Sequence, residues 1–333
     1  MKRTKIAFIG DGGWGTTLAI LLSRKDVDVS IWSAFPEYAS YLNKHRENKK
    51  FLPGFKIPKK ISITSDLNEA CAGSDTIVLA VPSQYLRGVL RRMKDCSLPA
   101  GADYLSVVKG IEGGSLKRMS EVIAEELGRI RIAVLSGPTI AREVAFGIPT
   151  TAVIASSGKE VREELQALFM SDSFRIYGND DVIGVELGGS LKNVIAIACG
   201  ISDGLGFGSN TKAALLSRGL AEMARLGKAM SAKARTFSGI SGLGDLVTTC
   251  ISRDSRNRSV GEQIGMGRSL DEIRRKMGLM IAEGVPTAES AHGLSLRYKV
   301  DMPICGEVYR VLYKEKSPVK AVKDLMTRQM KKE

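Results

Sequence analysis

The stretch KIAFIGDGGWGTTLAILL, residues 5–22, carries the strongest structural signal in the chain. An apolar run leads directly into Gly10, Gly12 and Gly15, and a second apolar run of helical length follows them. In a strand–turn–helix unit with this GxGxxG spacing, the first glycine permits the tight turn and the second lets a ligand approach the backbone. The third lets the helix pack on the strand, and amides at the helix N-terminus face an anion. The stretch therefore predicts a turn that binds the pyrophosphate of a dinucleotide, with a purely structural glycine turn as the alternative.

The expected end of the second strand does not decide between NAD and NADP. NAD sites usually place an Asp or Glu there to bind the ribose hydroxyls, and NADP sites often offer an Arg. This chain has WSA at residues 32–34, so both cofactors stay open, and Lys44, His45 and Arg46 are the nearest candidates to bind a 2′-phosphate. Asp11 is an acidic neighbour for a pyrophosphate, and we expect its side chain to point to solvent.

Short apolar runs alternate with helical patterns through the first half of the chain. Six such runs stand at residues 6–9, 27–32, 77–81, 104–108, 132–135 and 152–155. Continuous apolar strands that alternate with helices predict a parallel sheet buried on both faces. From residue 181 onward the sequence shows helical periodicity and no convincing strand. We therefore expect an α/β Rossmann-type domain with a parallel-rich sheet over residues 1–185, followed by an all-α domain over residues 186–333.

The composition is that of an ordinary soluble protein. Of the 333 residues, 44% are hydrophobic, and because no apolar run approaches the roughly 18 residues needed to span a bilayer, we expect no stable membrane insertion. The five cysteines have neither zinc-site spacing nor the density of a disulfide framework, which favours a reducing cytoplasm and no bound metal. The formal net charge of +13 raises nucleic-acid binding as an alternative. Basic and acidic residues are interleaved, however, which predicts a basic surface that attracts small anions and no nucleic-acid partner.

Two segments place polar residues where strands end, which is where ligands bind in open α/β sheets. Lys109 follows the apolar run at 104–108, and Gly137 and Thr139 follow the run at 132–135. Lys109 could instead be a solvent-facing lysine. Thr139 could serve only to cap a helix that begins at Ile140, although capping and ligand contact can coexist.

Lys192 stands in a helical pattern among unusually small residues. Gly188 and Gly189 precede it by four and three positions and Ala196 follows it by four, so all lie on one helix face. Because each interior glycine costs about 1 kcal/mol relative to alanine, we expect a ligand or another backbone to approach this face closely. Helix–helix packing alone is the alternative.

A glycine-rich segment, SGISGLGD at residues 238–245, is followed by SRN at residues 255–257. Arg256 could offer its planar fork, and Asn257 further donors, to a phosphate group. Alternatively, Asp245 only caps the next apolar segment, and Arg256 is only a surface cation.

Eight short motifs occur in order along the chain: GxGxWGTxLA at 10–19, VPSQ at 81–84, VKGIE at 108–112, SGPT at 136–139, LKNVIAIACG at 191–200, SGLGDL at 241–246, SRN at 255–257 and AEGVPTAES at 282–290. Together they resemble the motifs of bacterial NAD(P)-dependent glycerol-3-phosphate dehydrogenases over essentially the whole chain. The resemblance implies a cytoplasmic enzyme that interconverts dihydroxyacetone phosphate and sn-glycerol 3-phosphate with NAD or NADP. Such an enzyme supplies glycerol 3-phosphate for phospholipid synthesis.

The resemblance also implies a role for each matching residue. Lys192 would be the catalytic residue, and we hypothesise that it protonates the carbonyl oxygen as hydride arrives. The residues implied to contact substrate are Lys109, Gly137, Thr139, Lys192, Asp245, Ser255, Arg256 and Asn257. The residues implied to contact cofactor are Gly10, Gly12, Gly13, Trp14, Gly15, Lys109, Ala141, Arg256, Ile281 and Glu283. The chain departs from the family at Asp11, where Ala is common, and near Ser33, where Arg or His is frequent.

Other functions stay open on the residues alone. A dehydrogenase acting on a 3-hydroxy acid would share the first domain, but Arg256 and Asn257 favour a phosphate substrate. A non-catalytic dinucleotide sensor or a nucleic-acid-binding protein would leave the glycine-flanked Lys192 unexplained. We expect a homodimer, since two-fold homo-oligomers are the commonest assemblies.

Overall fold

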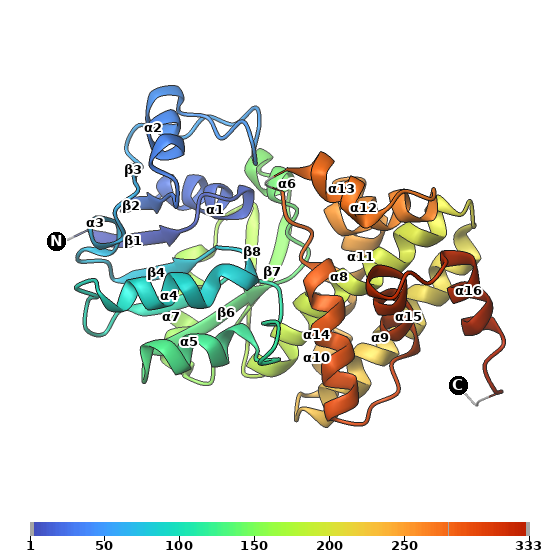
Figure 1. Cartoon of the computed structure of the whole chain (residues 1–333). Helices are drawn as coiled ribbons and strands as arrows, with labels where there is room; N and C mark the ends of the chain where they lie inside the picture. Colours follow the sequence, from blue (N-terminus) through green and yellow to red (C-terminus); the bar gives the residue numbers. More distant parts are fainter. Residues whose placement is uncertain (1–2, 279, 331–333) are drawn as a thin grey trace. The chain divides into compact units, whose positions relative to one another are not determined.

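The computed structural model describes residues 3–278 and 280–330 and divides into two compact units (Figure 1). Unit 1 comprises Met1–Lys109 and Lys117–Val185, and unit 2 comprises Gly110–Leu116 and Glu186–Glu333. The loop Gly110–Leu116 thus belongs to unit 2, although strands of unit 1 precede and follow it in the sequence.

Unit 1 is built on one eight-stranded sheet. Its strands are β1 (Thr4–Ile9), β2 (Val27–Trp32), β3 (Ser62–Thr64), β4 (Thr76–Leu79), β5 (Asp103–Ser106), β6 (Arg131–Ser136), β7 (Thr150–Ala155) and β8 (Phe174–Asn179). Their order across the sheet is β3-β2-β1-β4-β5-β6-β7-β8, and every neighbouring pair is parallel except β6 and β7. The strand order reverses between β1 and β4, so their carboxyl ends flank the crevice in which open α/β sheets bind ligands.

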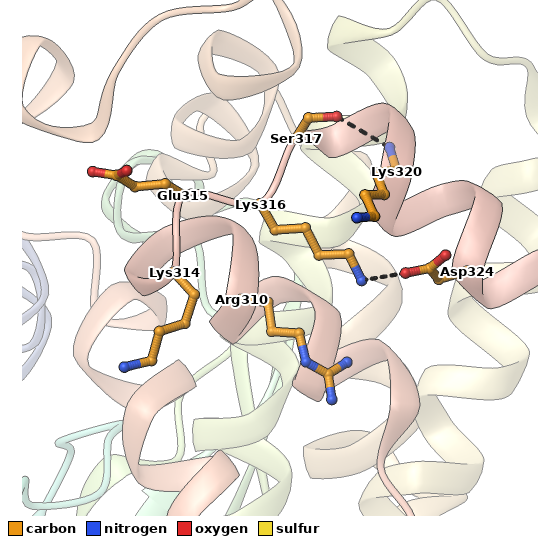
Figure 2. Close-up of a pocket in the computed structure, with 7 residues that line it drawn as sticks. All are labelled: Arg310, Lys314, Glu315, Lys316, Ser317, Lys320 and Asp324. Carbon is orange, nitrogen blue, oxygen red and sulfur yellow. Dashed lines mark hydrogen bonds and ion pairs between the residues drawn. The ribbon is translucent and has the colours of Figure 1, made fainter.

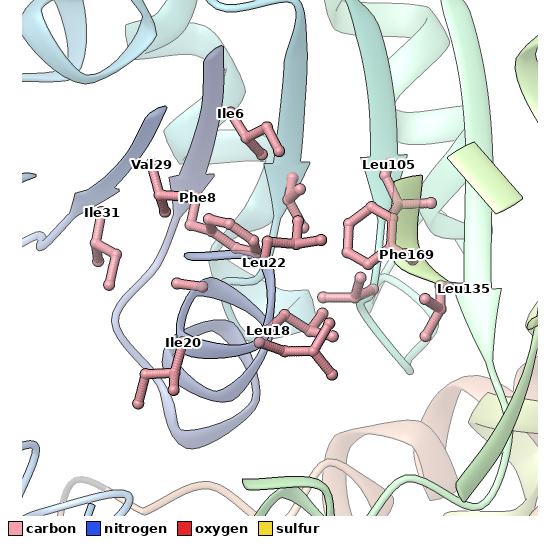
Figure 3. Packing of buried hydrophobic residues seen from close by; sticks show 14 of the residues in the cluster. Ile6, Phe8, Leu18, Ile20, Leu22, Val29, Ile31, Leu105, Leu135 and Phe169 are labelled. Carbon is pink, nitrogen blue, oxygen red and sulfur yellow. The ribbon is translucent and has the colours of Figure 1, made fainter. Parts of the chain in front are cut away.

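Helices cover both faces of this sheet. They are α1 (Gly13–Ser23), α2 (Pro36–His45), α3 (Leu67–Cys71), the short η1 (Ser83–Tyr85), α4 (Leu86–Lys94), α5 (Met119–Leu127), α6 (Ala141–Phe146) and α7 (Lys159–Phe169). Ile6 and Phe8 of β1 pack on one face with Leu18 of α1 and Phe169 of α7 (Figure 3). The alternate residues Ala7 and Ile9 join the cluster with α3, α4 and α5 on the other face. Burial on both faces explains why the strand sequences are continuously apolar.

The predicted fold class is confirmed, and each of the six apolar runs forms a strand. Two edge strands, β3 and β8, were not predicted. β3 has only three residues, and β8 alternates buried Phe174 and Ile176 with exposed Arg175 and Tyr177, so neither gives the continuous apolar signal used to find the others.

Apart from the loop Gly110–Leu116, the regular secondary structure in the described residues of unit 2 is helical. Its helices are α8 (Val182–Gly204), whose first residues still belong to unit 1, α9 (Ser209–Ala229), α10 (Ala234–Phe237), the π-helical turn η2 (Ile240–Gly244), α11 (Asp245–Ile251), α12 (Arg256–Gly265), α13 (Leu270–Met277), α14 (Gly284–Arg297), α15 (Pro303–Tyr313) and α16 (Pro318–Met326). α8 is the one helix of the described chain that is long and apolar enough to cross a membrane, but 89% of its most apolar window is buried inside the protein. It therefore has the character of a core helix.

Glycines let α8 and α12 cross at backbone contact. A Cβ at Gly200 would lie 2.0 Å from the carbonyl oxygen of Arg258, and one at Gly261 would lie 2.1 Å from that of Ile197. Such contacts leave no room for a side chain, so the glycine spacing on both helices fixes how closely they pack.

We expect Gly261→Ala to lower the free energy of unfolding by about 2 kcal/mol or more, because the new methyl group would collide with the α8 backbone. Gly306→Ala is the matched control. Gly306 also lies within a helix, α15, but a Cβ there would meet nothing within 4 Å, so this substitution should be neutral or stabilise by up to about 1 kcal/mol. Denaturant titration of both variants measures the difference, and equal stabilities would contradict the packing argument.

Candidate active site

The glycine turn after β1 separates packing glycines from one that faces open space. Gly10 has φ +122°, and its Cβ would lie 2.8 Å from the backbone of Ala80, which follows β4. A Cβ at Gly13 would lie 2.5 Å from the carbonyl oxygen of Phe51, and one at Gly15 would lie 2.6 Å from that of Gly10. At Gly12, the cap residue of α1, the nearest atom would be 4.0 Å away. The backbone is therefore bare and open where amides at the N-terminus of α1 can bind a pyrophosphate, so the turn fits a dinucleotide.

Two further predicted cofactor residues lie beside this turn. Trp14 contacts Phe174 edge-on, with ring centroids 6.2 Å apart, and its buried indole Nε1 has no hydrogen-bond partner among the described residues. Ala141 is the first residue of α6, and its carbonyl oxygen accepts a hydrogen bond from Thr17 Oγ1 of α1 at 3.2 Å. α6 is thereby tied to the helix that carries the glycine turn.

The expectation that Asp11 points to solvent is wrong. Its carboxylate accepts a hydrogen bond from Ser33 Oγ at 2.6 Å, directly after β2 ends at Trp32. Burial raises the pKa of Asp11, and the Ser33 hydroxyl opposes that shift. Asn48 also binds this loop, because its Nδ2 donates to the carbonyl oxygen of Asp11 at 2.7 Å and to Thr16 Oγ1 at 2.8 Å.

Lys109, Gly137 and Thr139 meet at the carboxyl ends of β5 and β6. Lys109 Nζ donates to the carbonyl oxygen of Gly137 at 2.8 Å and to Thr139 Oγ1 at 3.1 Å. The alternative of a free solvent-facing lysine is therefore wrong. The capping role weighed for Thr139 is also wrong, because Ile140 is the cap residue of α6 and the helix has no side-chain cap.

Lys192 of α8 is buried and paired in unit 2. Its ammonium group forms an ion pair with Asp245, the first residue of α11, and donates to Thr249 Oγ1 at 2.7 Å. The side chains of Lys192 and Asp245 are only 8% and 1% exposed. Thr249 Oγ1 in turn donates to the carbonyl oxygen of Asp245 at 2.7 Å. A buried lysine is costly unless it is paired, so this arrangement holds an ammonium group at a defined position.

The backbone of another segment packs against the helix face that carries Lys192. The sequence predicted that either a ligand or another backbone approaches this face closely. A Cβ at Gly188 would lie 2.5 Å from the carbonyl oxygen of Ser241 in η2. Gly188 thus lets η2 pack against α8, and α11 follows η2 directly and presents Asp245 to Lys192. The glycine-rich segment therefore positions Asp245, which does not cap α11 with its side chain.

The SRN segment forms the start of α12. Ser255 caps this helix, since its Oγ accepts from the backbone N–H of Arg258 at 3.2 Å. Asn257 is buried; its Nδ2 donates to Asn193 Oδ1 at 2.9 Å, and its Oδ1 accepts from the N–H of Gly284 at 2.8 Å. Asn257 thus joins α8, α12 and α14, and one of its two amide hydrogens is already engaged.

Arg256 differs from its neighbours because its side chain is exposed. Within residues 3–278 and 280–330, no hydrogen bond or ion pair engages its guanidinium. The carboxylate of Glu283, the cap residue of α14, supplies a negative charge that acts on this guanidinium. Ile281 is half-buried in the segment just before Glu283. A free guanidinium fork is the group expected where a phosphate is to be bound.

Sequence reasoning missed four residues that support these groups: Ser33, Asn48, Asn193 and Thr249. Thr249 follows Asp245 by four positions on α11, and a helical i, i+4 pairing could have identified it. Asn193 directly follows Lys192. Asn48 lies in a loop, and no spacing in the sequence connects it to the glycine turn.

A separate surface pocket in unit 2 is unrelated to these residues (Figure 2). Its lining residues are Arg310, Lys314, Glu315, Lys316, Ser317, Lys320 and Asp324. Lys316 Nζ lies 2.6 Å from Asp324, so its charge is already paired. None of the predicted site residues lines this pocket.

The features found in each of the two units define a class of protein. Unit 1 has a doubly wound sheet with a bare glycine turn, and unit 2 has a buried lysine paired with a carboxylate. This combination is typical of a Rossmann-type oxidoreductase.

Comparison with known proteins specifies the family. The model of the NAD-dependent glycerol-3-phosphate dehydrogenase N-terminus matches residues 5–162, and that of the C-terminus matches residues 181–323. The chain belongs to this family. It is 51% identical to glycerol-3-phosphate dehydrogenase [NAD(P)+] of Citrifermentans bemidjiense, covering 99% of this chain and 98% of that protein. The counterpart from Chlorobium phaeobacteroides is 50% identical, with 99% of each chain covered. The crystal structure of the Coxiella burnetii glycerol-3-phosphate dehydrogenase matches with a TM-score of 0.94 and 39% identity, covering 98% of this chain and 99% of that one.

Proposed function

We propose that this protein reduces dihydroxyacetone phosphate to sn-glycerol 3-phosphate with NAD(P)H, and catalyses the reverse reaction. The buried Lys192–Asp245 pair is the observation that carries this proposal, because a carbonyl reduction needs a proton donor held in place. Membership of the glycerol-3-phosphate dehydrogenase family supports the choice of substrate.

Lys192 is the proton donor in this proposal. Bound NAD(P)H supplies the hydride, and the ammonium group of Lys192 hydrogen-bonds the carbonyl oxygen and protonates it as it becomes an alkoxide. Asp245 and Thr249 hold the ammonium group in one orientation. In the reverse direction Lys192 accepts the proton from the substrate hydroxyl.

The other predicted site residues bind and orient the two ligands. Arg256 anchors the phosphate with its free guanidinium, and Ser255 and Asn257 set the start of the helix that carries it. The other proposed substrate contacts are Lys109, Gly137, Thr139, Lys192, Asp245, Ser255 and Asn257. The proposed cofactor contacts are Gly10, Gly12, Gly13, Trp14, Gly15, Lys109, Ala141, Arg256, Ile281 and Glu283.

We place residues 1–185 as the cofactor domain and residues 186–333 as the substrate domain of a cytoplasmic homodimer. In the cell the product would enter phospholipid synthesis. The buried character of α8 and the five free cysteine thiols support this proposed location.

An initial-rate assay tests the proposed reaction. NADH oxidation should be fast with dihydroxyacetone phosphate, much slower with unphosphorylated dihydroxyacetone, and negligible with a 3-keto acid. Running NADH and NADPH in parallel also measures cofactor choice. Turnover of the 3-keto acid in preference to dihydroxyacetone phosphate would favour the 3-hydroxy acid alternative, and no oxidation with any of them would favour a dinucleotide sensor.

A further inference from the structure

The end of β2 in this fold normally carries the residue that distinguishes NAD from NADP. In Rossmann-type sheets an Asp or Glu there binds the 2′-hydroxyl of the adenosine ribose, and an Arg nearby accommodates a 2′-phosphate. In this chain β2 ends at Trp32 and is followed by Ser33 and Ala34, so the strand itself provides neither group.

A carboxylate nevertheless reaches this position from the glycine turn. Asp11 lies between Gly10 and Gly12, and Ser33 Oγ donates to its Oδ2 at 2.6 Å. The carbonyl oxygen of Asp11 also accepts from Asn48 Nδ2 at 2.7 Å, which fixes the backbone that carries the side chain. The acidic group therefore lies beside Ser33, the residue that follows β2, while Asn48 holds the backbone of Asp11.

Cations in this part of unit 1 are mostly engaged by other groups. Arg46 donates to the carbonyl oxygen of Ile61 at 2.8 Å, and the His45 ring lies tilted against Tyr41 with centroids 4.4 Å apart. Arg92 lies 5.2 Å from the Trp32 ring centroid. Lys50 lies 4.5 Å from the Tyr38 ring centroid, and its positive charge also acts on the Asp11 carboxylate. Of the three residues considered as partners for a 2′-phosphate, only Lys44 lacks such a contact among the described residues, and it is exposed on the last turn of α2.

We propose that Asp11, oriented by Ser33, is the specificity residue that makes this protein prefer NADH to NADPH. Its carboxylate can accept a hydrogen bond from the ribose 2′-hydroxyl, as an acid at the end of β2 does in other sheets of this kind. A 2′-phosphate would bring a second anion to the same place, and like charges at a binding site reject the ligand that carries them. The proposal rests on dinucleotide binding by the glycine turn and is independent of the substrate.

Equilibrium titration of the full chain with each cofactor, followed by reduced-nicotinamide fluorescence, tests this proposal without any turnover. The unmodified protein should bind NADH at least about tenfold more tightly than NADPH. Asp11→Asn keeps the size of the side chain and removes its charge, so the ratio of the two dissociation constants should shrink by about tenfold, mainly because NADPH binds more tightly. Ser33→Ala should reduce the ratio of the two dissociation constants by less, because the Asp11 carboxylate keeps its charge and loses only the hydrogen bond that orients it.

Asp26→Asn is the matched control. Asp26 precedes β2, at the end of the strand opposite to Ser33; its side chain is 80% exposed and pairs with Arg3. The substitution removes an equal charge far from the glycine turn, so the ratio of the NADPH and NADH dissociation constants should stay unchanged. A protein that prefers NADPH, or an Asp11→Asn variant whose ratio stays within about twofold, would overturn the proposal. Loss of NADH binding in both Asp11→Asn and Asp11→Ala would also overturn it, since Asp11 would then be structural. Selective NADH binding without turnover of dihydroxyacetone phosphate would instead contradict the proposed reaction alone.

Discussion

Lys192→Met should lower kcat for dihydroxyacetone phosphate reduction by at least about a hundredfold, because general acid catalysis by a positioned side chain contributes about 10²–10⁴ in rate. Methionine keeps much of the length and apolar stem of lysine but cannot donate a proton. NADH affinity should barely change, because the glycine turn that we propose to bind the pyrophosphate belongs to unit 1 and Lys192 belongs to unit 2.

The test combines steady-state kinetics with NADH titration. Lys228→Met is the matched control, since Lys228 is an exposed residue in the last turn of α9, and it should keep near-normal kcat. A Lys192→Met variant with near-normal kcat would remove Lys192 from the proton-transfer role. A variant that loses NADH binding would make it a cofactor or folding residue.

Arg256→Lys should raise KM for dihydroxyacetone phosphate by roughly ten- to a hundredfold, although the positive charge is kept. A lysine ammonium is a point charge and cannot reproduce the two parallel hydrogen bonds that an arginine fork makes to phosphate. Loss of one charged hydrogen bond costs about 1.5–3 kcal/mol, which corresponds to that range.

Kinetics with unphosphorylated dihydroxyacetone distinguish a loss of phosphate binding from a general loss of activity. For unphosphorylated dihydroxyacetone, Arg256→Lys should change kcat/KM little, so the preference for the phosphorylated substrate should shrink. Arg268→Lys is the control, because Arg268 follows the other end of α12, where its side chain donates a hydrogen bond to Gln263 Oε1 at 2.9 Å. If KM for dihydroxyacetone phosphate stayed within about twofold in Arg256→Lys, Arg256 would not be the phosphate anchor.

The features that follow from local pattern could be predicted from sequence. Buried parallel strands are continuously apolar, and the glycine turn has a spacing imposed by its own geometry, so both were identified. The small residues around Lys192 likewise predicted that a ligand or another backbone approaches this helix face, although the sequence did not identify η2 as the segment that does so.

Features that depend on contacts between distant segments could not be predicted. The carboxylate of Asp11 was expected to face solvent because a pyrophosphate would repel it, whereas the fold places Ser33 within hydrogen-bond distance. Threonine is a common helix-capping residue, yet Lys109 donates a hydrogen bond to the hydroxyl of Thr139, and Ile140 occupies the cap position of α6. In both cases a tertiary hydrogen bond outweighs the local preference.

The fate of the hydride tests the central claim most directly. The protein would be incubated with dihydroxyacetone phosphate and NADH that carries deuterium at both C4 positions of the nicotinamide, and the product would be analysed by NMR and mass spectrometry. We expect one deuterium on C2 of sn-glycerol 3-phosphate, with a single configuration at that carbon. NADH oxidation without deuterium at C2, or a racemic product, would contradict direct hydride transfer to the carbonyl of a substrate whose phosphate is anchored by Arg256 and whose carbonyl oxygen is protonated by Lys192.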